Sequence, residues 1–186
     1  VPLTQQHSCC VPTSIQMIMY RNNIPLVPAE ELGYHMGLTV APENKHLFYD
    51  VRSAETPPSE AGYGTQIFEP EYDPNKTFGH FDIPLKFRLL LASEIADETE
   101  LLKLLSEIEE KDGDALLCFN HGVIKGEFKA YTGHVVVFDK IVKGEVQIVD
   151  ASPNQPKWRK VKVELLFEAI KCHAKNSGGI WYFDRN

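Results

Sequence analysis

The residues best suited to chemistry begin with two adjacent cysteines, Cys9 and Cys10, which stand just before a stretch of helical spacing. A thiol attacks a carbonyl carbon as the thiolate, and both a helix N-terminus and a nearby imidazolium lower the pKa of a thiol. Pro12 suits the first turn of a helix, where its missing N–H breaks no hydrogen bond. The sequence therefore predicts Cys10, at the mouth of this helix, as a nucleophile, with Cys9 as the alternative.

A histidine suited to act as the base opens the strongest strand pattern of the chain, "TGHVVVFDKI". This residue is His134, and we expect Gly133 to leave its backbone side uncrowded. An imidazole also needs a carboxylate or amide that accepts from its second ring nitrogen and fixes its orientation. Asp150 ends the next strand pattern, "EVQIVD", and is the candidate for that part.

The two strand patterns are separated by Lys143-Gly144, which predicts a tight turn and an antiparallel hairpin. In such a hairpin Asp150 lies opposite Val136 or Val137. Strict pairing around a two-residue turn places Asp150 opposite Val137, on the face away from His134. A β-bulge or an odd-length loop is therefore required to bring the carboxylate and the imidazole to one face.

Acyl transfer also needs donors for the oxyanion of the tetrahedral intermediate. A side-chain amide upstream of the nucleophile, from Gln5 or Gln6, could join the backbone N–H of Cys10 in this task. The chemistry needs no metal and no organic cofactor. The predicted partner is a peptide or a peptide-like amide as substrate.

These segments resemble the papain-like cysteine peptidase clan, and most closely its double-glycine (bacteriocin) leader peptidase-like group. The resemblance is carried by "QQHSCCVPTSIQMI", "GHVVVFDKI" and "VQIVDASP", within residues 5–20 and 131–153. It implies a papain-like fold. It also implies Cys10 as nucleophile, His134 as general base and acid, Asp150 as the residue that orients His134, and Gln5 as oxyanion donor.

The sequence departs from the pattern of that group in three places. Val11 and Thr13 replace small residues after the nucleophile, Gln5 stands one residue closer to it than usual, and "DASP" carries two extra residues before the proline. A second resemblance, to phytochelatin synthase, is carried by "VDASPNQPKWRKVKVELLFEAI". It implies a transpeptidase as the alternative to a hydrolase, because a thioester can be resolved by an amine or by water. A non-catalytic binding module of the same fold is the other alternative.

Other residues have simpler interpretations. His121 lies in a glycine-flanked turn, without a strand that ends in a carboxylate beside it, and is a weaker candidate for the base. A zinc site from His7, Cys9 and Cys10 lacks the paired spacing of zinc ligands. We interpret Cys118 and Cys172 as core thiols, because their neighbours are apolar, and Trp158 as a packing residue.

The elements that must position these residues follow from the apolar periodicity. Helices are predicted at residues 12–21, within 27–37, at 97–113 with Asp97 as N-cap, and at 163–173; strands are predicted at 114–119, 128–131, 134–142, 145–150 and 178–184. Residues 41–82 are predicted to be irregular and to wall the cleft. Helices followed by an antiparallel sheet indicate an α+β fold, with an N-terminal helical lobe whose nucleophile helix packs against the sheet. We expect one domain over residues 1–186.

Composition limits the remaining possibilities. The chain has 186 residues, of which 43% are hydrophobic, and no stretch is apolar for long enough to cross a membrane. A net charge of -7 without a basic cluster argues against a nucleic-acid partner. Four scattered cysteines do not make a disulfide framework and favour a reducing compartment, cytoplasmic rather than secreted. The start at Val1 indicates a trimmed chain or a mature product, and the oligomeric state is left open.

Overall fold

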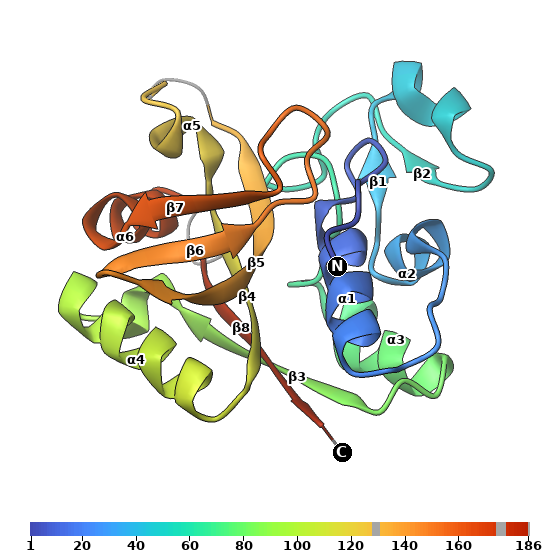
Figure 1. The fold of residues 1–186 in the computed structure, drawn as a ribbon. Coiled ribbons are helices and arrows are strands. Elements are labelled where there is room, and N and C mark those ends of the chain that lie inside the picture. Colours follow the sequence, from blue (N-terminus) through green and yellow to red (C-terminus); the bar gives the residue numbers. More distant parts are fainter. Residues whose placement is uncertain (128–130, 174–177, 186) are drawn as a thin grey trace.

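A six-stranded antiparallel sheet forms the centre of the molecule, in the strand order β3-β8-β4-β5-β6-β7 (Figure 1). The computed structural model describes residues 1–127, 131–173 and 178–185. Its six main strands are β3 (Leu85–Leu91), β4 (Asp114–Asn120), β5 (Gly133–Val142), β6 (Glu145–Val149), β7 (Trp158–Lys162) and β8 (Gly179–Arg185). Four of these correspond to predicted strands, and the expected strand at 128–131 lies outside the described residues except for its last residue.

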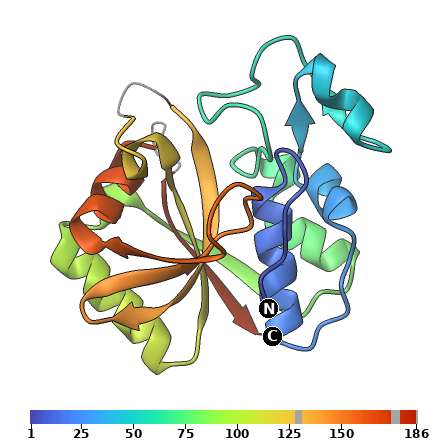
Figure 2. The same cartoon turned by 45° about the horizontal axis from the view of Figure 1, so that its top comes forward.

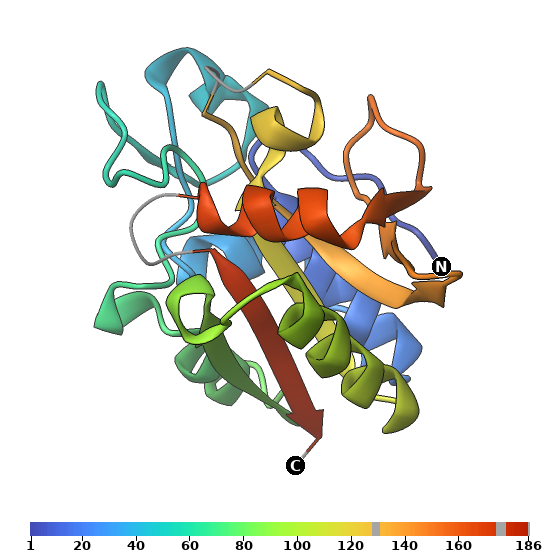
Figure 3. The same ribbon diagram turned by 90° about the vertical axis from the view of Figure 1, so that its left-hand side faces the viewer.

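Helices cover both faces of this sheet. The helices are α1 (Cys10–Arg21), α2 (Ala29–His35), α3 (Pro74–His80), α4 (Glu98–Glu110), α5 (His121–Ile124) and α6 (Val163–Lys171). Helices α4 and α6 pack on one face and α1, α2 and α3 on the other (Figure 2), and Figure 3 shows α4 and α6 in front of the sheet with α1 behind it. The α+β architecture with an N-terminal helical lobe is as predicted.

Strand β4 shows why the sheet can carry a core on each side. All seven of its residues are buried. Leu117 and Phe119 belong to the core beneath α4 and α6, whereas Leu116 and Cys118 belong to the core beneath α1. Because successive side chains of a strand point to opposite faces, a continuous apolar run is what a sheet covered on both faces requires.

Helix α1 begins at Cys10, two residues before the predicted start, so the nucleophile candidate is the first helical residue. The N–H of Thr13 donates to the carbonyl of Cys9 at 3.0 Å and closes the first turn. The residues of α1 that face the sheet are fully or nearly fully buried, among them Ile15, Ile18 and Met19. Burial of this face fixes the helix, and with it the position of its N-terminal thiol, against β5.

The prediction of Asp97 as the N-cap of helix α4 is confirmed. The side chain of Asp97 accepts from the N–H of Glu100 at 2.9 Å, and the helix ends at Glu110, before Gly113. The predicted helices at 12–21, 27–37 and 163–173 are also present, as α1, α2 and α6. None of the helices among the described residues has the length and apolar character needed to span a membrane.

Several expectations about the fold were wrong. Residues 41–82 contain β2 (Arg52–Ser53), which pairs in parallel with β1 (Thr39–Val40), and helix α3, capped by Asp73. The remaining short elements are 3-10 turns, η1 (Pro42–Leu47), η2 (Pro70–Tyr72) and η3 (Ala92–Glu94). Strands β3 and β7 were not predicted, since their charged residues hide a short alternating pattern.

Two single residues were also misplaced. Cys172, expected in the core, is exposed, because it follows the last turn of α6. Trp158, expected to pack, is 54% exposed at the start of the edge strand β7.

Candidate active site

The hairpin of β5 and β6 carries the β-bulge that the sequence required. Val142 pairs with Glu145 around the Lys143-Gly144 turn, and the register then shifts between Phe138 and Lys140. Beyond the shift Val137 pairs with Val149, so Asp150 comes next to Val136 rather than Val137. His134 and Val136 share a face of β5, and the extra residue therefore places Asp150 on the side of His134.

The imidazole and the carboxylate are in direct contact. Nε2 of His134 lies 2.8 Å from Oδ1 of Asp150, and both side chains are buried. Oδ1 also accepts from the N–H of Ser152 at 2.9 Å. Because Nε2 faces Asp150, Nδ1 is the ring nitrogen left for a thiol. The Asp150 side chain is thus held from two directions before any substrate is present.

Cys10 completes the group from the other lobe. It is only partly buried, at the first position of α1, and it interacts with His134 both by a hydrogen bond and through its charge. Sulfur, imidazole and carboxylate from three distant segments of the chain therefore converge at the N-terminus of the nucleophile helix. The helix dipole there favours the thiolate form of a cysteine.

The electrostatics of the pair favour a protonated imidazole. Burial lowers the pKa of His134, but the hydrogen bonds to Asp150 and Cys10 and their charges outweigh burial and raise that pKa from 6.5 to about 9. Burial raises the pKa of Asp150, but the hydrogen bond and charge of His134, with the donors Ser152 and Arg159, lower it to about 2. An imidazolium stabilised in this way is the partner that a thiolate needs.

The two glutamines considered as oxyanion donors differ in their contacts and in their burial. The Nε2 of Gln6 donates to the carbonyl of Leu47, and Gln6 is exposed. Gln5 is half-buried beside Cys10 in the same cavity, and its Oε1 is buried with no hydrogen-bond partner among the described residues.

The segment that carries Gln5 is tied to the segment that carries Asp150. The N–H of Gln5 donates to the carbonyl of Ala151 at 2.9 Å. The ammonium of Lys157 donates to the carbonyls of Leu3, Ala151 and Ser152 at 3.1 to 3.3 Å. One lysine thereby links the N-terminal strand-like segment to the loop after β6, and it fixes Gln5 relative to Asp150.

An open cavity of about 700 Å³ surrounds these groups. Cys10, His134 and Gln5 line it, and a segment at residues 57–63 forms one wall. Residues 152–155 form another wall. The expectation that the irregular region 41–82 contributes to the cleft is therefore confirmed for this segment.

The structure explains the glycine at position 133 differently from our expectation. A Cβ at this position would lie 2.9 Å from Nε2 of His173 and 3.2 Å from the carbonyl oxygen of Ala61. The glycine is required because two other groups approach the backbone closely, and not because it leaves open space beside His134.

The alternative nucleophile and base are less well placed. Burial, followed by the charges of Cys10 and Glu30, raises the pKa of Cys9 to about 12. His121 lies in the cavity wall, but burial and then the charges of His134 and Arg159 lower its pKa to about 4. Within the described residues no group of three His, Cys, Asp or Glu side chains is arranged to hold a metal ion, the set His7, Cys9 and Cys10 included.

Sequence reasoning missed Arg159, which donates to the Oδ2 of Asp150 at 2.8 Å. It also dismissed His121, whose ring stacks on that of His134 with centroids 4.9 Å apart. The alternation in "WRKVK", with Arg159 and Val161 on one face, is the signal that could have placed Arg159 inward.

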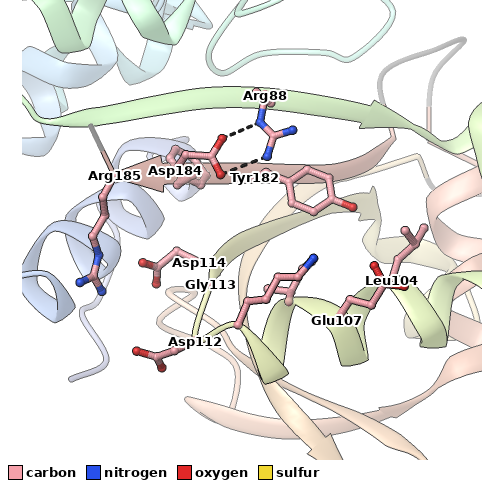
Figure 4. Close-up of a pocket in the computed structure, with 12 residues that line it drawn as sticks. Arg88, Leu104, Glu107, Asp112, Gly113, Asp114, Tyr182, Asp184 and Arg185 are labelled. Atoms are coloured by element: carbon pink, nitrogen blue, oxygen red, sulfur yellow. Dashed lines mark hydrogen bonds and ion pairs between the residues drawn. The ribbon is translucent and has the colours of Figure 1, made fainter.

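A second cavity, of about 490 Å³, lies between α4 and strands β3 and β8 (Figure 4). Several of its charged groups are paired: Arg88 pairs with Asp184, with Nε at 2.6 Å from Oδ2. Asp112 and Asp114 pair with Arg21. No cysteine or histidine lines this cavity, and its residues therefore offer no nucleophile comparable to Cys10.

No family model and no curated protein matches the sequence. Solved structures do match the fold. A double glycine motif protease from an AMS/PCAT transporter, in complex with the leader peptide, matches with a TM-score of 0.53 and 15% identity over 100% of this chain and 91% of that chain. A protein from Bacillus anthracis described as a C39-like peptidase matches with a TM-score of 0.61 and 19% identity over 100% and 96%. The chain therefore has the fold of the papain-like C39 cysteine peptidases, as its sequence motifs predicted.

Proposed function

We propose that this protein is a cysteine peptidase that cleaves a peptide or a peptide-like amide with Cys10, His134 and Asp150. The observation that carries the proposal is the 2.8 Å contact between His134 and Asp150 beside a partly exposed cysteine at a helix N-terminus. The fold shared with the matched peptidases supports a hydrolase of this kind.

In the first half of the reaction, the Cys10 thiolate attacks the carbonyl carbon of the scissile amide, and a carbon–sulfur bond forms. The electron pair of the carbonyl moves to oxygen, where the N–H of Cys10 and the side-chain amide of Gln5 receive it. The oxyanion then collapses, and the carbon–nitrogen bond breaks. The leaving amine takes the proton of Nδ1 of His134, which acts as general acid.

In the second half, the neutral His134 takes a proton from water, and the hydroxide oxygen attacks the thioester. Collapse of the second tetrahedral intermediate releases the carboxylic acid product and returns the Cys10 thiolate and the His134 imidazolium. Asp150 stays ionised throughout and orients the ring, because its pKa lies near 2.

The substrate in this proposal is a peptide segment that enters the cavity between residues 57–63 and 152–155. A matched structure holds a leader peptide, which supports a peptide substrate here. An amine in place of water would convert the same thioester into a transfer product, and the two outcomes are separated by the assay below.

The proposal is tested by mapping thiol alkylation with iodoacetamide near neutral pH by mass spectrometry. Cys172 is exposed and serves as the internal reference. We expect Cys10 to react at least about tenfold faster than Cys172, and this advantage to vanish in His134→Ala, because the imidazolium that stabilises the thiolate is gone. Equal rates at the two thiols in the wild-type protein would contradict the proposal.

Turnover is tested with a library of peptides that carry a fluorogenic amide leaving group. Cleavage by the wild-type protein but not by Cys10→Ala is expected. Addition of glycine ester as acceptor then separates hydrolysis from transfer by the ratio of amide product to acid product, because a hydrolase gives mainly the acid and a transferase gives mainly the amide.

A further inference from the structure

The carboxylate of Asp150 has a second partner besides His134. Its Oδ2 accepts from Nη2 of Arg159 at 2.8 Å, while its Oδ1 receives Nε2 of His134 and the N–H of Ser152. Arg159 comes from the second residue of β7, on the inward face of the strand, and its side chain is only 16% exposed. The guanidinium therefore fixes the carboxylate on the side opposite the imidazole.

The same nitrogen of Arg159 reaches a second histidine. Nη2 lies 3.0 Å from Nε2 of His121. An arginine NH₂ group has two protons and accepts none, so one proton goes to Asp150 and the other to the lone pair of His121. Nε2 of His121 must then be the bare nitrogen, and its ring proton is on Nδ1.

His121 in turn supports the ring of His134. The two imidazoles are stacked, with centroids 4.9 Å apart and planes 21° apart. Phe119 meets the ring of His134 edge-on at 6.0 Å. Stacking on His121 thus sets the plane of the His134 ring. The contact with Asp150 sets which ring nitrogen points toward the carboxylate.

We propose that Arg159 and His121 are positioning residues of the candidate active site, with Arg159 holding Asp150 and His121 in one hydrogen-bonded chain and His121 supporting the ring of His134. This inference rests on the proposed function. It assigns to the edge strand β7 and to the short helix α5 a part in orienting the catalytic imidazole, in addition to the loop after β6.

The chain of contacts has a chemical consequence. Burial, then the charges of His134 and Arg159, lower the pKa of His121 to about 4, so His121 stays neutral while His134 carries a proton. A neutral ring stacked on an imidazolium is attractive, whereas two adjacent cations would repel. With its lone pair engaged by Arg159, His121 also cannot compete with His134 for the thiol proton.

The charged and titratable groups around His134 come from four elements. They are Cys10 from α1, Asp150 after β6, His121 from α5 and Arg159 from β7, with Lys125 after α5 acting on His121. By charge alone, removal of Arg159 would stabilise the imidazolium and lower the pH midpoint of thiolate formation. A positioning role predicts the opposite, because a loosened Asp150 stabilises the imidazolium less. The sign of the shift therefore separates the two effects.

The experiment measures the rate of Cys10 alkylation by iodoacetamide from pH 5 to 9 in the full chain, with folding checked by circular dichroism. In Arg159→Met we expect the midpoint to rise by about one pH unit and the rate at the wild-type midpoint to fall about fivefold or more. Arg159→Lys, which keeps a charged donor, should return the rate to within about threefold. The matched control is Lys160→Met, which removes the same charge from the exposed face of the same strand.

His121→Ala and His121→Phe extend the test and decide it if Arg159→Met does not fold. We expect His121→Ala to raise the midpoint, and His121→Phe to lie between it and the wild type because a ring still stacks on His134. Midpoints and rates equal to the wild type in Arg159→Met, or in both His121 variants, would overturn the inference, as would a lower midpoint in Arg159→Met. A loss of thermal stability without a shift of midpoint assigns these residues a structural role only and overturns it as well.

A spectroscopic measurement separates this inference from the proposed function. In ¹⁵N-histidine NMR spectra, His121 should be the neutral Nδ1–H tautomer near neutral pH, and this tautomer should be lost in Arg159→Met. If wild-type Cys10 reacts no faster than Cys172, the proposed function fails and the inference fails with it. If wild-type Cys10 is fast and the variants match it, only the inference fails.

Discussion

Cys10 with His134 and Cys118 with His173 are two cysteine–histidine pairs close to β4 and β5, and their surroundings shift the pKa values of the two imidazoles in opposite directions. Sγ of Cys118 lies 3.5 Å from Nε2 of His173, so proximity of sulfur and nitrogen is common to both pairs. Burial lowers the pKa of His173 to about 4, and burial with the charge of Cys10 raises that of Cys118 well above its ordinary value. The pKa of His134, in contrast, is raised to about 9.

The difference in pKa arises from the groups that contact each imidazole and from the element that carries each thiol. His134 faces the ionised carboxylate of Asp150, and Cys10 stands at a helix N-terminus with partial access to the cavity. Cys118 is instead in the middle of a buried strand, within an apolar core. A buried imidazole beside a sulfur is easier to protonate where a carboxylate offsets the effect of burial, and His173 shows the effect of burial alone.

The largest effect should come from deleting one thiol of each pair. In the proposed reaction, Cys10→Ala removes the nucleophile, and peptide cleavage should fall by at least about 10³-fold. Cys118→Ala should leave the rate within about threefold of the wild type and cost about 1 kcal/mol of stability, because it only leaves a small cavity. Cleavage assays and urea unfolding of both variants check this, and loss of cleavage in Cys118→Ala alone would reverse our assignment of the pairs.

The next largest effect should come from a substitution that makes the pair of Cys10 and His134 resemble the pair of Cys118 and His173, in which the pKa of the histidine is lowered. Asp150→Asn keeps the shape of the side chain but removes its charge, so the pKa of His134 should fall and cleavage should drop by about 10²- to 10⁴-fold. The ring titration of His134 by NMR and the alkylation rate of Cys10 measure the two changes. A His134 that still titrates near 9 in this variant would show that Asp150 is not the source of the shift.

The histidines of the two pairs should also make the free energy of unfolding depend on pH, His134 above pH 6.5 and His173 below it. His134 is protonated more readily in the folded chain, so its stabilisation is complete below 6.5 and is lost as the pH rises through about 9. His173 and His121 are harder to protonate in the folded chain, so stability is lost as the pH falls from 6.5 towards about 4. The Asp150 contribution is lost later, as the pH falls from 3.8 towards about 2.

The free energy of unfolding should therefore peak near pH 6.5 and fall on both sides, by on the order of 2–3 kcal/mol at pH 9 and on the order of 4 kcal/mol at pH 4.5, where two histidines contribute. Urea titrations at pH 4.5, 6.5 and 9 test this. Asp150→Asn should flatten the alkaline limb, and His173→Gln should reduce the acid limb. A wild-type stability that is flat between pH 6.5 and 9 would be at odds with a raised pKa at His134.

The smallest effect concerns the residue where the two pairs meet. Gly133 precedes His134, and a Cβ there would lie 2.9 Å from the ring of His173. Gly133→Ala should cost about 1–3 kcal/mol, because neither the ring nor the backbone of Ala61 can easily give way. It should also slow alkylation of Cys10, since β5 must shift. Gly79→Ala is the control, because a Cβ at Gly79 meets nothing within 4 Å, and thermal unfolding distinguishes the two.

Local signals allowed much of the fold to be predicted. Asp97 predicted the start of α4, and Pro12 predicted the first turn of α1. The two-residue turn at Lys143-Gly144 predicted the hairpin of β5 and β6. The need for a bulge or an odd-length loop in that hairpin also followed from the sequence, because residue parity alone decides which face a strand residue occupies. The bulge is present between Phe138 and Lys140.

Edge strands and the residues that brace the site could not be predicted in the same way. Strand β7 alternates exposed and inward residues over only five positions, and its register is set by pairing with β6. Cys172 was placed in the core because its neighbours are apolar, and Trp158 was interpreted as a packing residue, but exposure depends on which side of an element faces the protein. Periodicity over so few residues does not fix that side.

The amino-acid sequence by itself determined which residues of this protein are the candidates for the chemistry, because a thiol before a helix, a histidine at the start of a strand and an aspartate after the next strand are local patterns. It determined the fold class for the same reason. Only the tertiary structure decided that His121 and Arg159 lie in contact with these candidates. Those assignments depend on distances between segments far apart in the chain and on burial, which change the charge of identical side chains.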